Sequence, residues 1–268
     1  MQEYEVKTSD GLALKVKRWG DSVGKALIMI HGIGEHGGRY PHVAKHFFQK
    51  GYDVFTYDQR GHGVSGGKLG HSPGVETNLD DLQLVIDSID HDELYLYGHS
   101  WGGNVLVNYL LRRECSSLKA AVLSAPWMWL KKQPSKIDVA LATVMNRIYP
   151  SFTQNNEIDV SALSTIDRVG EDYLADPLVH PKISAGLFNS FYASGLFAIE
   201  NAGSLKVPTL LIHGADDQIV DPEGSKEFAR KSGAELKIYS ETRHELHNDV
   251  KSEEVLNDVS TWLATSPT

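Results

Sequence analysis

Short apolar runs recur along the chain and alternate with longer segments that have helical periodicity. Residues 26–30 (Ala-Leu-Ile-Met-Ile) are apolar throughout, as expected of a strand buried on both faces of a parallel sheet. Similar runs predict further strands at residues 53–57, 94–97, 120–123, 209–213 and 235–239, and an amino-terminal hairpin at residues 4–8 and 12–19. Helical spacing is found at residues 41–50, 77–90, 104–113 and 252–263. Strands that alternate with helices predict an α/β fold with a mostly parallel sheet and right-handed crossovers.

The alternation stops between residues 126 and 205. Two segments in this stretch have helical spacing and are rich in Leu, Met, Phe and Tyr, namely residues 137–149 and 184–201. The stretch is too long for a loop, so we expect a helical cap at residues 126–205, inserted between core segments 1–125 and 206–268. Because ligands of open α/β sheets bind beyond the carboxyl ends of the strands, such a cap would cover the site.

One predicted strand leads directly into a serine that is flanked by glycines. Residues 94–97 are followed by Gly98-His99-Ser100-Trp101-Gly102, and a helix follows at once. A serine on so sharp a turn has a strained backbone, and the residues two positions away must have almost no side chain. The turn exposes the hydroxyl above the sheet. This context therefore predicts Ser100 as a nucleophile.

A nucleophilic serine needs a base and an orienting carboxylate, which in this topology follow it in the order acid and then histidine. After the fifth parallel strand come Asp216, Asp217 and Asp221, of which Asp221 is better placed as a helix N-cap. After the last strand come His244 and His247, and His244 lies nearer the strand end. We favour Asp217 and His244, although the residues themselves leave Asp216 and His247 open.

The oxyanion formed in acyl transfer needs two backbone N–H donors. One follows the nucleophile directly, and the other lies in the loop after the third strand. These positions are Trp101 and Ile33. Ile33 stands between two glycines, which let backbone N–H groups approach a substrate.

Composition narrows the functional classes. A net charge of −9 without a Lys/Arg cluster argues against nucleic acid binding. Cys115 is the single cysteine, so no intrachain disulfide is expected. His42 and His46 are four residues apart but lack the glutamate of an H-E-x-x-H motif, so no catalytic metal is expected. The first residues do not resemble a signal peptide, and the longest apolar stretch is too short to span a bilayer, which predicts a soluble, cytoplasmic protein.

Further motifs are spread along the chain. They are His31-Gly32-x-Gly34-Glu35-His36-x-Gly38-Arg39-Tyr40, Asp58-x-Arg60-Gly61-His62-Gly63-x-Ser65, Gly98-His99-Ser100-x-Gly102-Gly103, Asp176-Pro177-Leu178, His213-Gly214-x-x-Asp217 and His244-x-x-His247. With these motifs the sequence resembles the monoacylglycerol lipase and lysophospholipase group of serine α/β-hydrolases. The resemblance covers nearly the whole chain, and the predicted cap is the region that it covers least.

This resemblance implies an α/β-hydrolase fold, with an eight-stranded, mostly parallel sheet flanked by helices and an inserted helical cap. It implies Ser100 as nucleophile, Asp217 as acid and His244 as base. It also implies that the N–H groups of Ile33 and Trp101 bind the oxyanion. Trp101 stands where methionine is common in the family, which would narrow the acyl pocket or shift the chain-length preference.

The resemblance also extends to substrate binding. Family members look to hold head-group hydroxyls with residues that match Glu35, Arg39 and His247. In the cap, Leu187 and Phe188 are candidates for lining an acyl-chain tunnel above the nucleophile. Aromatic and aliphatic stripes of this kind more often pack one helix onto another.

Together these features predict a cofactor-free serine hydrolase that cleaves monoacylglycerols or similar single-chain lipid esters through an acyl-enzyme. Its expected partner is a small lipid ester, with transient membrane or micelle contact through the cap. A lysophospholipase, a general medium-chain carboxylesterase and a thioesterase are alternatives that the sequence does not separate. A non-catalytic ligand-binding member of the fold is disfavoured, because all three triad positions are filled.

Overall fold

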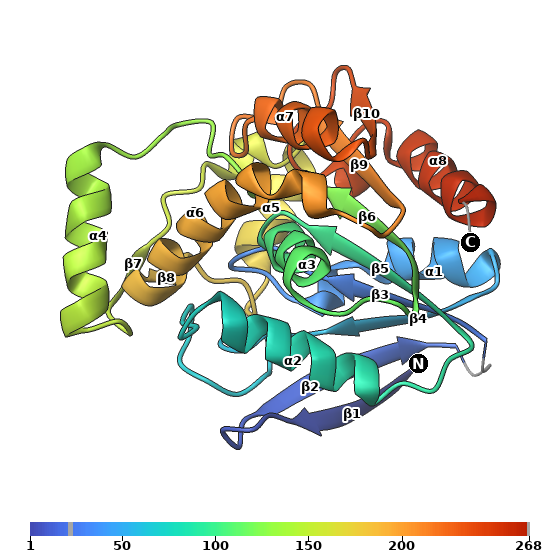
Figure 1. The fold of residues 1–268 in the computed structure, drawn as a ribbon, viewed down its shortest axis with the longest axis horizontal. Helices are drawn as coiled ribbons and strands as arrows, with labels where there is room; N and C mark the ends of the chain where they lie inside the picture. The colour runs from blue at the N-terminus through green and yellow to red at the C-terminus, as the bar shows by residue number, and fades with distance from the viewer. Residues whose placement is uncertain (21–23, 267–268) are drawn as a thin grey trace.

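A sheet of eight strands runs through the molecule in the order β1-β2-β4-β3-β5-β6-β9-β10 (Figure 1). The structure is a computed structural model that describes residues 1–20 and 24–266. β2 pairs with β1 and with β4 in antiparallel fashion, and the other neighbouring pairs of this sheet are parallel. The predicted eight-stranded, mostly parallel sheet is thus confirmed. The strands are β1 (Gln2–Lys7), β2 (Ala13–Trp19), β3 (Lys25–Ile30), β4 (Tyr52–Tyr57), β5 (Glu93–His99), β6 (Leu118–Ser124), β9 (Thr209–Gly214) and β10 (Glu235–Tyr239).

Burial explains the composition of the strands. Every residue of β4 is buried, and so is every residue of β3 except Lys25, because helices cover both faces of the central sheet. β1 and β2 form the edge hairpin, and within the two strands only Val6, Leu14 and Val16 are buried. This contrast matches the continuous and the alternating apolar patterns in the sequence.

Five helices of the sheet domain divide between the two faces. One hydrophobic core joins the sheet to α1 and α8, and another joins it to α2, α3 and α7. Figure 1 shows α2 and α3 on the near side of the sheet. These helices are α1 (Pro41–Gln49), α2 (Val75–Asp87), α3 (Trp101–Arg112), α7 (Pro222–Ser232) and α8 (Ser252–Thr265), and the short 3-10 turns are η1 (Gly37–Arg39), η2 (Val160–Ala162), η3 (Ala202–Ser204) and η4 (Leu246–Asn248).

The segment between β6 and β9 contains more structure than the sequence predicts. The two expected helices are α4 (Lys136–Ile148) and α6 (Ala185–Glu200). Sequence analysis missed a third helix, α5 (Asp167–Ala175), and a small antiparallel pair, β7 (Thr153–Asn155) with β8 (Lys182–Ser184). Figure 1 shows α4 at the outer edge of the molecule, next to the end of α6.

α6 belongs to the main core as much as to the inserted segment. Its buried side chains include Phe191 and Ile199, which join the core formed with α2 and α3. Buried polar groups also connect it to α3, since Asn104 Nδ2 donates to the Phe191 carbonyl at 3.0 Å and Ser194 Oγ donates to Asn104 Oδ1 at 2.7 Å. α6 is therefore fixed to the sheet domain, whereas α4 has no buried residue.

Within residues 1–20 and 24–266, no helix combines the length and the apolarity that a bilayer span requires.

Candidate active site

Ser100 lies at the tight turn between β5 and α3, and its backbone is strained as the sequence predicts. Its φ of 54° and ψ of −116° lie in a region that residues with a side chain rarely adopt. A Cβ at Gly98 would lie 2.5 Å from the Gly102 carbonyl oxygen, and one at Gly102 would lie 2.1 Å from the Ile30 carbonyl oxygen. The two glycines are therefore required by close backbone contacts, and they let the turn present the serine side chain at the carboxyl end of the sheet.

The loops after β9 and β10 bring a carboxylate and an imidazole to this serine. Ser100 Oγ lies 2.9 Å from His244 Nε2, and His244 Nδ1 lies 2.7 Å from Asp217 Oδ2. With Nδ1–H donating to the carboxylate, Nε2 is free to accept the serine proton. Of the residues that the sequence left open, Asp216 is exposed and both ring nitrogens of His247 have no hydrogen-bond partner.

The carboxylate of Asp217 is fixed on both of its oxygens. Oδ1 accepts hydrogen bonds from the backbone N–H groups of Ile219 at 2.8 Å and Val220 at 3.0 Å. Oδ2 also lies 3.1 Å from His213 Nε2. Asp221, the rival candidate, accepts from the Glu223 N–H and caps α7, as its position before Pro222 suggests.

Charge interactions shift the pKa values of both Asp217 and His244. Burial alone would raise the pKa of Asp217, but His244 and the hydrogen bonds from His213 and His244 lower it below its usual range. Burial alone would lower the pKa of His244, but the charge and hydrogen bond of Asp217 raise it above its ordinary value. The imidazole is therefore a stronger base than free histidine.

The loop after β3 also lies close to Ser100. Gly32 N–H donates to Glu35 Oε1 at 2.6 Å, and a Cβ at Gly32 would lie 3.3 Å from Ser100 Cβ. Ile33 follows in this loop, and Trp101 is the first residue of α3, where N–H groups have no partner within the helix. These are the two positions at which the sequence predicts oxyanion donors.

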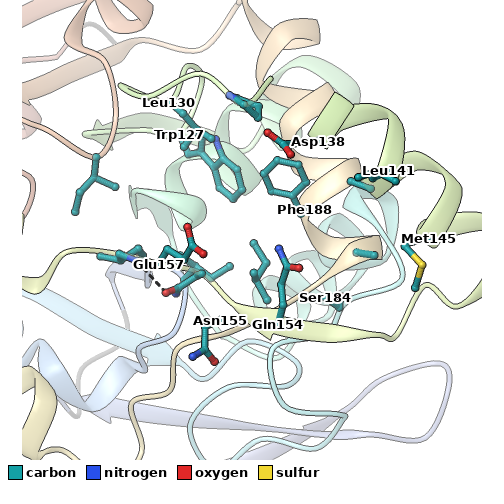
Figure 2. A pocket seen from close by; sticks show the side chains of 18 of the residues that line it. Trp127, Leu130, Asp138, Leu141, Met145, Gln154, Asn155, Glu157, Ser184 and Phe188 are labelled. Carbon is teal, nitrogen blue, oxygen red and sulfur yellow. Dashed lines mark hydrogen bonds between the residues drawn. The ribbon is translucent and has the colours of Figure 1, made fainter. Parts of the chain in front are cut away.

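A cavity of about 480 Å³ opens next to Ser100 and extends beneath the inserted segment. One wall is largely apolar and includes Trp127 and Phe188, whose ring centroids are 6.3 Å apart, together with Leu141 and Met145 of α4 (Figure 2). Asp138 of α4 adds a carboxylate on the same side. The other side carries polar residues of the β7 region, labelled in Figure 2 as Gln154, Asn155 and Glu157, beside the apolar Ile158 and Ile183. A cavity with a long apolar wall and a polar opposite side suits an amphiphilic ligand.

Comparison with known proteins identifies the family. A model of the family described as serine aminopeptidase, S33 matches residues 21–251. The chain belongs to this family.

Relatives of this S33 family member span most of its length. A monoacylglycerol lipase of Mycolicibacterium smegmatis is 33% identical over 245 residues, which are 88% of this chain and 87% of that protein. An uncharacterized abhydrolase domain-containing protein of Dictyostelium discoideum is 33% identical over 263 residues, which are 96% of this chain and 28% of that protein. The crystal structure of Paleococcus ferrophilus monoacylglycerol lipase has a TM-score of 0.88 at 28% identity and covers 100% of both chains. The α/β-hydrolase fold is thereby confirmed.

In this S33 family member, one prediction about the acyl pocket needs correction, and burial also bears on a second. Leu187 does not line the cavity: its side chain is fully buried in the main core, while Phe188 lines the wall. The Trp101 ring is also fully buried, with its centroid 4.8 Å from that of His62 and 5.4 Å from that of Phe191. Trp101 therefore does not line the cavity, and an effect on chain-length preference stays a prediction.

None of the predicted head-group residues Glu35, Arg39 and His247 lines the large cavity. Glu35 borders a small pocket of about 20 Å³ that also contacts Ser100 and His244. Arg39 is engaged by two carboxylates, and His247 is stacked on Tyr40 with ring centroids 4.8 Å apart. Arg39 and His247 line neither the large cavity nor this small pocket.

One residue of this region was missed by sequence analysis. Glu245 is 2% exposed and binds Arg39 with both of its carboxylate oxygens. Its place directly after His244 was the available signal, but an acidic residue in a loop is ordinarily solvated. Only the fold reveals that this carboxylate is buried and paired.

Proposed function

We propose that this S33 family member is a monoacylglycerol hydrolase, a serine carboxylic ester hydrolase that releases fatty acid and glycerol through an acyl-enzyme. The observation that carries the proposal is the hydrogen-bonded line Ser100–His244–Asp217, which ends at the wall of a cavity with a long apolar side. Similarity to the monoacylglycerol lipases of Mycolicibacterium smegmatis and Paleococcus ferrophilus supports this substrate class. A complete triad argues against a non-catalytic role.

The geometry suits a two-step mechanism. Ser100 Oγ attacks the ester carbonyl while its proton passes to His244 Nε2, and Asp217 stabilises the resulting imidazolium through Nδ1–H. The N–H groups of Ile33 and Trp101 would bind the oxyanion. The C–O bond to glycerol then breaks, and His244 gives its proton to the departing oxygen. Water, deprotonated by the same imidazole, attacks the acyl-enzyme and releases the fatty acid.

The inserted segment would serve as the cap, residues 126–205 in our division of the chain. In this arrangement the acyl chain lies along the apolar wall formed by Trp127, Phe188 and α4. An acyl chain that carries a polar group at its far end would place that group near the side-chain amides of Gln154 and Asn155 in β7. Phe188 is the wall residue whose neighbour in sequence, Leu187, packs in the core instead.

α4 is also the element that we propose to contact the lipid surface presenting the substrate. Its Ile137, Leu141, Val144 and Ile148 follow one helical face and are 72%, 58%, 51% and 75% exposed. Leu141 also lines the cavity, so this apolar face is continuous with the acyl-chain wall. The net charge of −9 favours a neutral rather than an anionic surface. A cytoplasmic location stays a prediction from the sequence.

Replacing the nucleophile tests the proposed function. Ser100→Ala is expected to lower monoacylglycerol turnover by about 10⁴- to 10⁶-fold and to abolish labelling by a fluorophosphonate, because both need the Ser100 hydroxyl. Ser88→Ala, at the end of α2, is the matched serine control and should keep both. Retained turnover in Ser100→Ala would refute the nucleophile, whereas a wild-type enzyme that is labelled but does not cleave monoacylglycerols would refute the substrate class.

A further inference from the structure

A largely enclosed arginine joins two buried carboxylates that border the same small pocket as Ser100. Arg39 Nη1 donates to Glu35 Oε2 at 2.6 Å and to Glu245 Oε1 at 2.7 Å, and Nη2 donates to Glu245 Oε2 at 2.9 Å. The three side chains are 10%, 3% and 2% exposed, in the order Arg39, Glu35 and Glu245. Two acidic groups thus share one cation away from water. Since desolvation makes such groups costly, their contribution to stability alone does not explain them.

Each carboxylate of this group reaches a different part of the catalytic machinery. Glu35 Oε1 accepts from the N–H of Gly32 at 2.6 Å, and Gly32 directly precedes the oxyanion donor Ile33. Glu245 directly follows His244 in the chain. A continuous path of charge-assisted hydrogen bonds therefore runs from the loop after β3, through Arg39, to the loop after β10.

Other contacts fix both ends of this path. Tyr40 OH donates to Glu35 Oε1 at 2.7 Å, and Asn248 Nδ2 donates to Glu245 Oε2 at 2.7 Å. The Glu245 N–H donates to the Leu163 carbonyl at 2.7 Å, which ties the same loop to the inserted segment. With these partners in place, Glu245 is held on its backbone and on both carboxylate oxygens.

We propose that Glu245 and Arg39 are positioning residues, which hold the base loop and the oxyanion loop at a fixed separation around Ser100. The inference rests on the proposed function, since it assigns these loops to catalysis. Bidentate pairing of a carboxylate with a guanidinium fixes both distance and orientation. Small displacements of reacting groups lower rates strongly, so rigid coupling of the two loops serves the chemical step.

The same carboxylate acts on His244 through its charge. The groups that surround this imidazole are Asp217 from the β9 loop, His99 at the end of β5, Glu35 from the β3 loop, Tyr173 of α5 and Glu245 itself. Burial lowers the pKa of His244, while Asp217 most strongly, and Glu245 and Glu35 in addition, raise it. Removing the charge of Glu245 should therefore lower this pKa.

Two variants of Glu245 separate geometry from charge. Glu245→Gln keeps the length of the side chain but removes the charge and places an amide NH₂ against the guanidinium or Asn248. Glu245→Asp keeps the charge but is one methylene too short for the same bidentate contact. Both should lower kcat by about tenfold or more with KM within about twofold of wild type. Only Glu245→Gln should move the acidic limb of the pH–rate profile to lower pH.

A matched control is offered by another buried bidentate pair. Arg60 Nε donates to Asp81 Oδ2 at 2.6 Å and Nη2 donates to Asp81 Oδ1 at 2.8 Å, joining the loop after β4 to α2. Asp81→Asn should cost stability but leave kcat and the pH profile as in wild type. Tyr40→Phe is a milder variant of the path itself, since it removes one donor to Glu35 and keeps the ring. It should lower kcat several-fold at unchanged KM.

The measurements use the full chain with a monoacylglycerol, with the methyl ester of the same fatty acid, and with a fluorophosphonate that labels Ser100. A positioning role predicts equal losses of kcat for both esters and slower labelling. If kcat fell only for the monoacylglycerol and its KM rose, the inference would be overturned, because the varied residues would then contact the glycerol head group. Glu245 and Tyr40 variants that match Asp81→Asn in kcat and pH profile would also overturn it. Absence of labelling in wild type would instead refute the proposed function.

Discussion

Leu187 and Phe188 are adjacent residues of α6, but their side chains face different parts of the molecule. The Leu187 side chain is fully buried in the main core, whereas Phe188 lines the cavity opposite the β7 side. Successive positions of a helix point about 100° apart, so neighbours in sequence face different parts of the molecule. The helical pattern alone did not tell which of the two would face the substrate.

This difference makes a testable pair. Phe188→Ala is expected to raise the ratio of long-chain to short-chain kcat/KM by about tenfold. Removing the ring enlarges the cavity next to the acyl chain, so a longer chain can be accommodated. Leu187→Ala should leave that ratio unchanged and lower the free energy of unfolding by about 2–5 kcal/mol, since it opens a void in the core. A series of p-nitrophenyl esters and urea unfolding measure the two effects. An unchanged ratio in Phe188→Ala would remove the ring from the acyl pocket.

At the residue scale, most of the candidate triad could be predicted from the sequence. Ser100 could be singled out because it directly follows a strand, and parallel strands deliver their carboxyl ends to one edge of the sheet. Position after a strand narrowed the acid to Asp216 or Asp217 and the base to His244 or His247, and the family resemblance favoured Asp217 and His244. Glu245 could not be found in this way. Its role depends on Arg39, 206 positions earlier in the chain, and no local pattern reports such a pairing.

At the scale of elements, short polar pieces escaped prediction. β7 and β8 have three residues each, and β7 consists of Thr153, Gln154 and Asn155, which give no apolar pattern. α5 has only Gly170 and Tyr173 buried among nine residues. Their structure comes from tertiary pairing rather than from local periodicity, whereas longer elements such as α2 and α6 were found to within a few residues of their ends.

The exposed face of α4 gives a prediction at this scale. The double variant Ile137→Ser with Ile148→Ser removes the two most exposed apolar side chains of this face. It should lower monoacylglycerol turnover in zwitterionic vesicles by about tenfold, because less apolar surface enters the interface. Turnover of a water-soluble short-chain ester should not change, since neither residue lines the cavity.

Leu174→Ser provides the control for that experiment. Leu174 is 70% exposed on α5, so its replacement removes one apolar side chain of similar exposure outside α4. Vesicle cosedimentation and hydrolysis should both remain as in wild type. Equal losses in the control and the double variant would contradict a specific contact through α4.

For the whole molecule, buried histidines set the dependence of stability on pH. Burial lowers the pKa of five buried histidines, in the case of His99 to about 3; they are His31, His62, His99, His180 and His247. These imidazoles stay neutral in the folded protein but take up protons near pH 6.5 in the unfolded chain. His244 has the opposite sign: its raised pKa contributes stability that is complete below pH 6.5 and lost as pH rises through the folded value.

Among the described buried histidines, five lowered pKa values against one raised value predict a protein that loses stability below about pH 6.5. Each additional proton bound by the unfolded chain lowers the free energy of unfolding by about 1.4 kcal/mol per pH unit. Urea unfolding at pH 7.5 and at pH 5.0 should show this loss. His247→Phe, which removes an imidazole whose nitrogens have no partner, should make the pH dependence weaker. Equal or greater stability at pH 5.0 in the wild type would contradict this account.

The attachment of α6 to α3 also limits how this enzyme can be remodelled. Because Asn104 and Ser194 bind across the two helices, a chimera that exchanged the entire segment between β6 and β9 with that of a relative would have to reproduce this buried seam. A graft that replaces α4, β7 and the connection to α5 leaves the seam intact. Swapping that outer portion among relatives is therefore the practical route to new acyl-chain selectivity, with the sheet and its serine left unchanged.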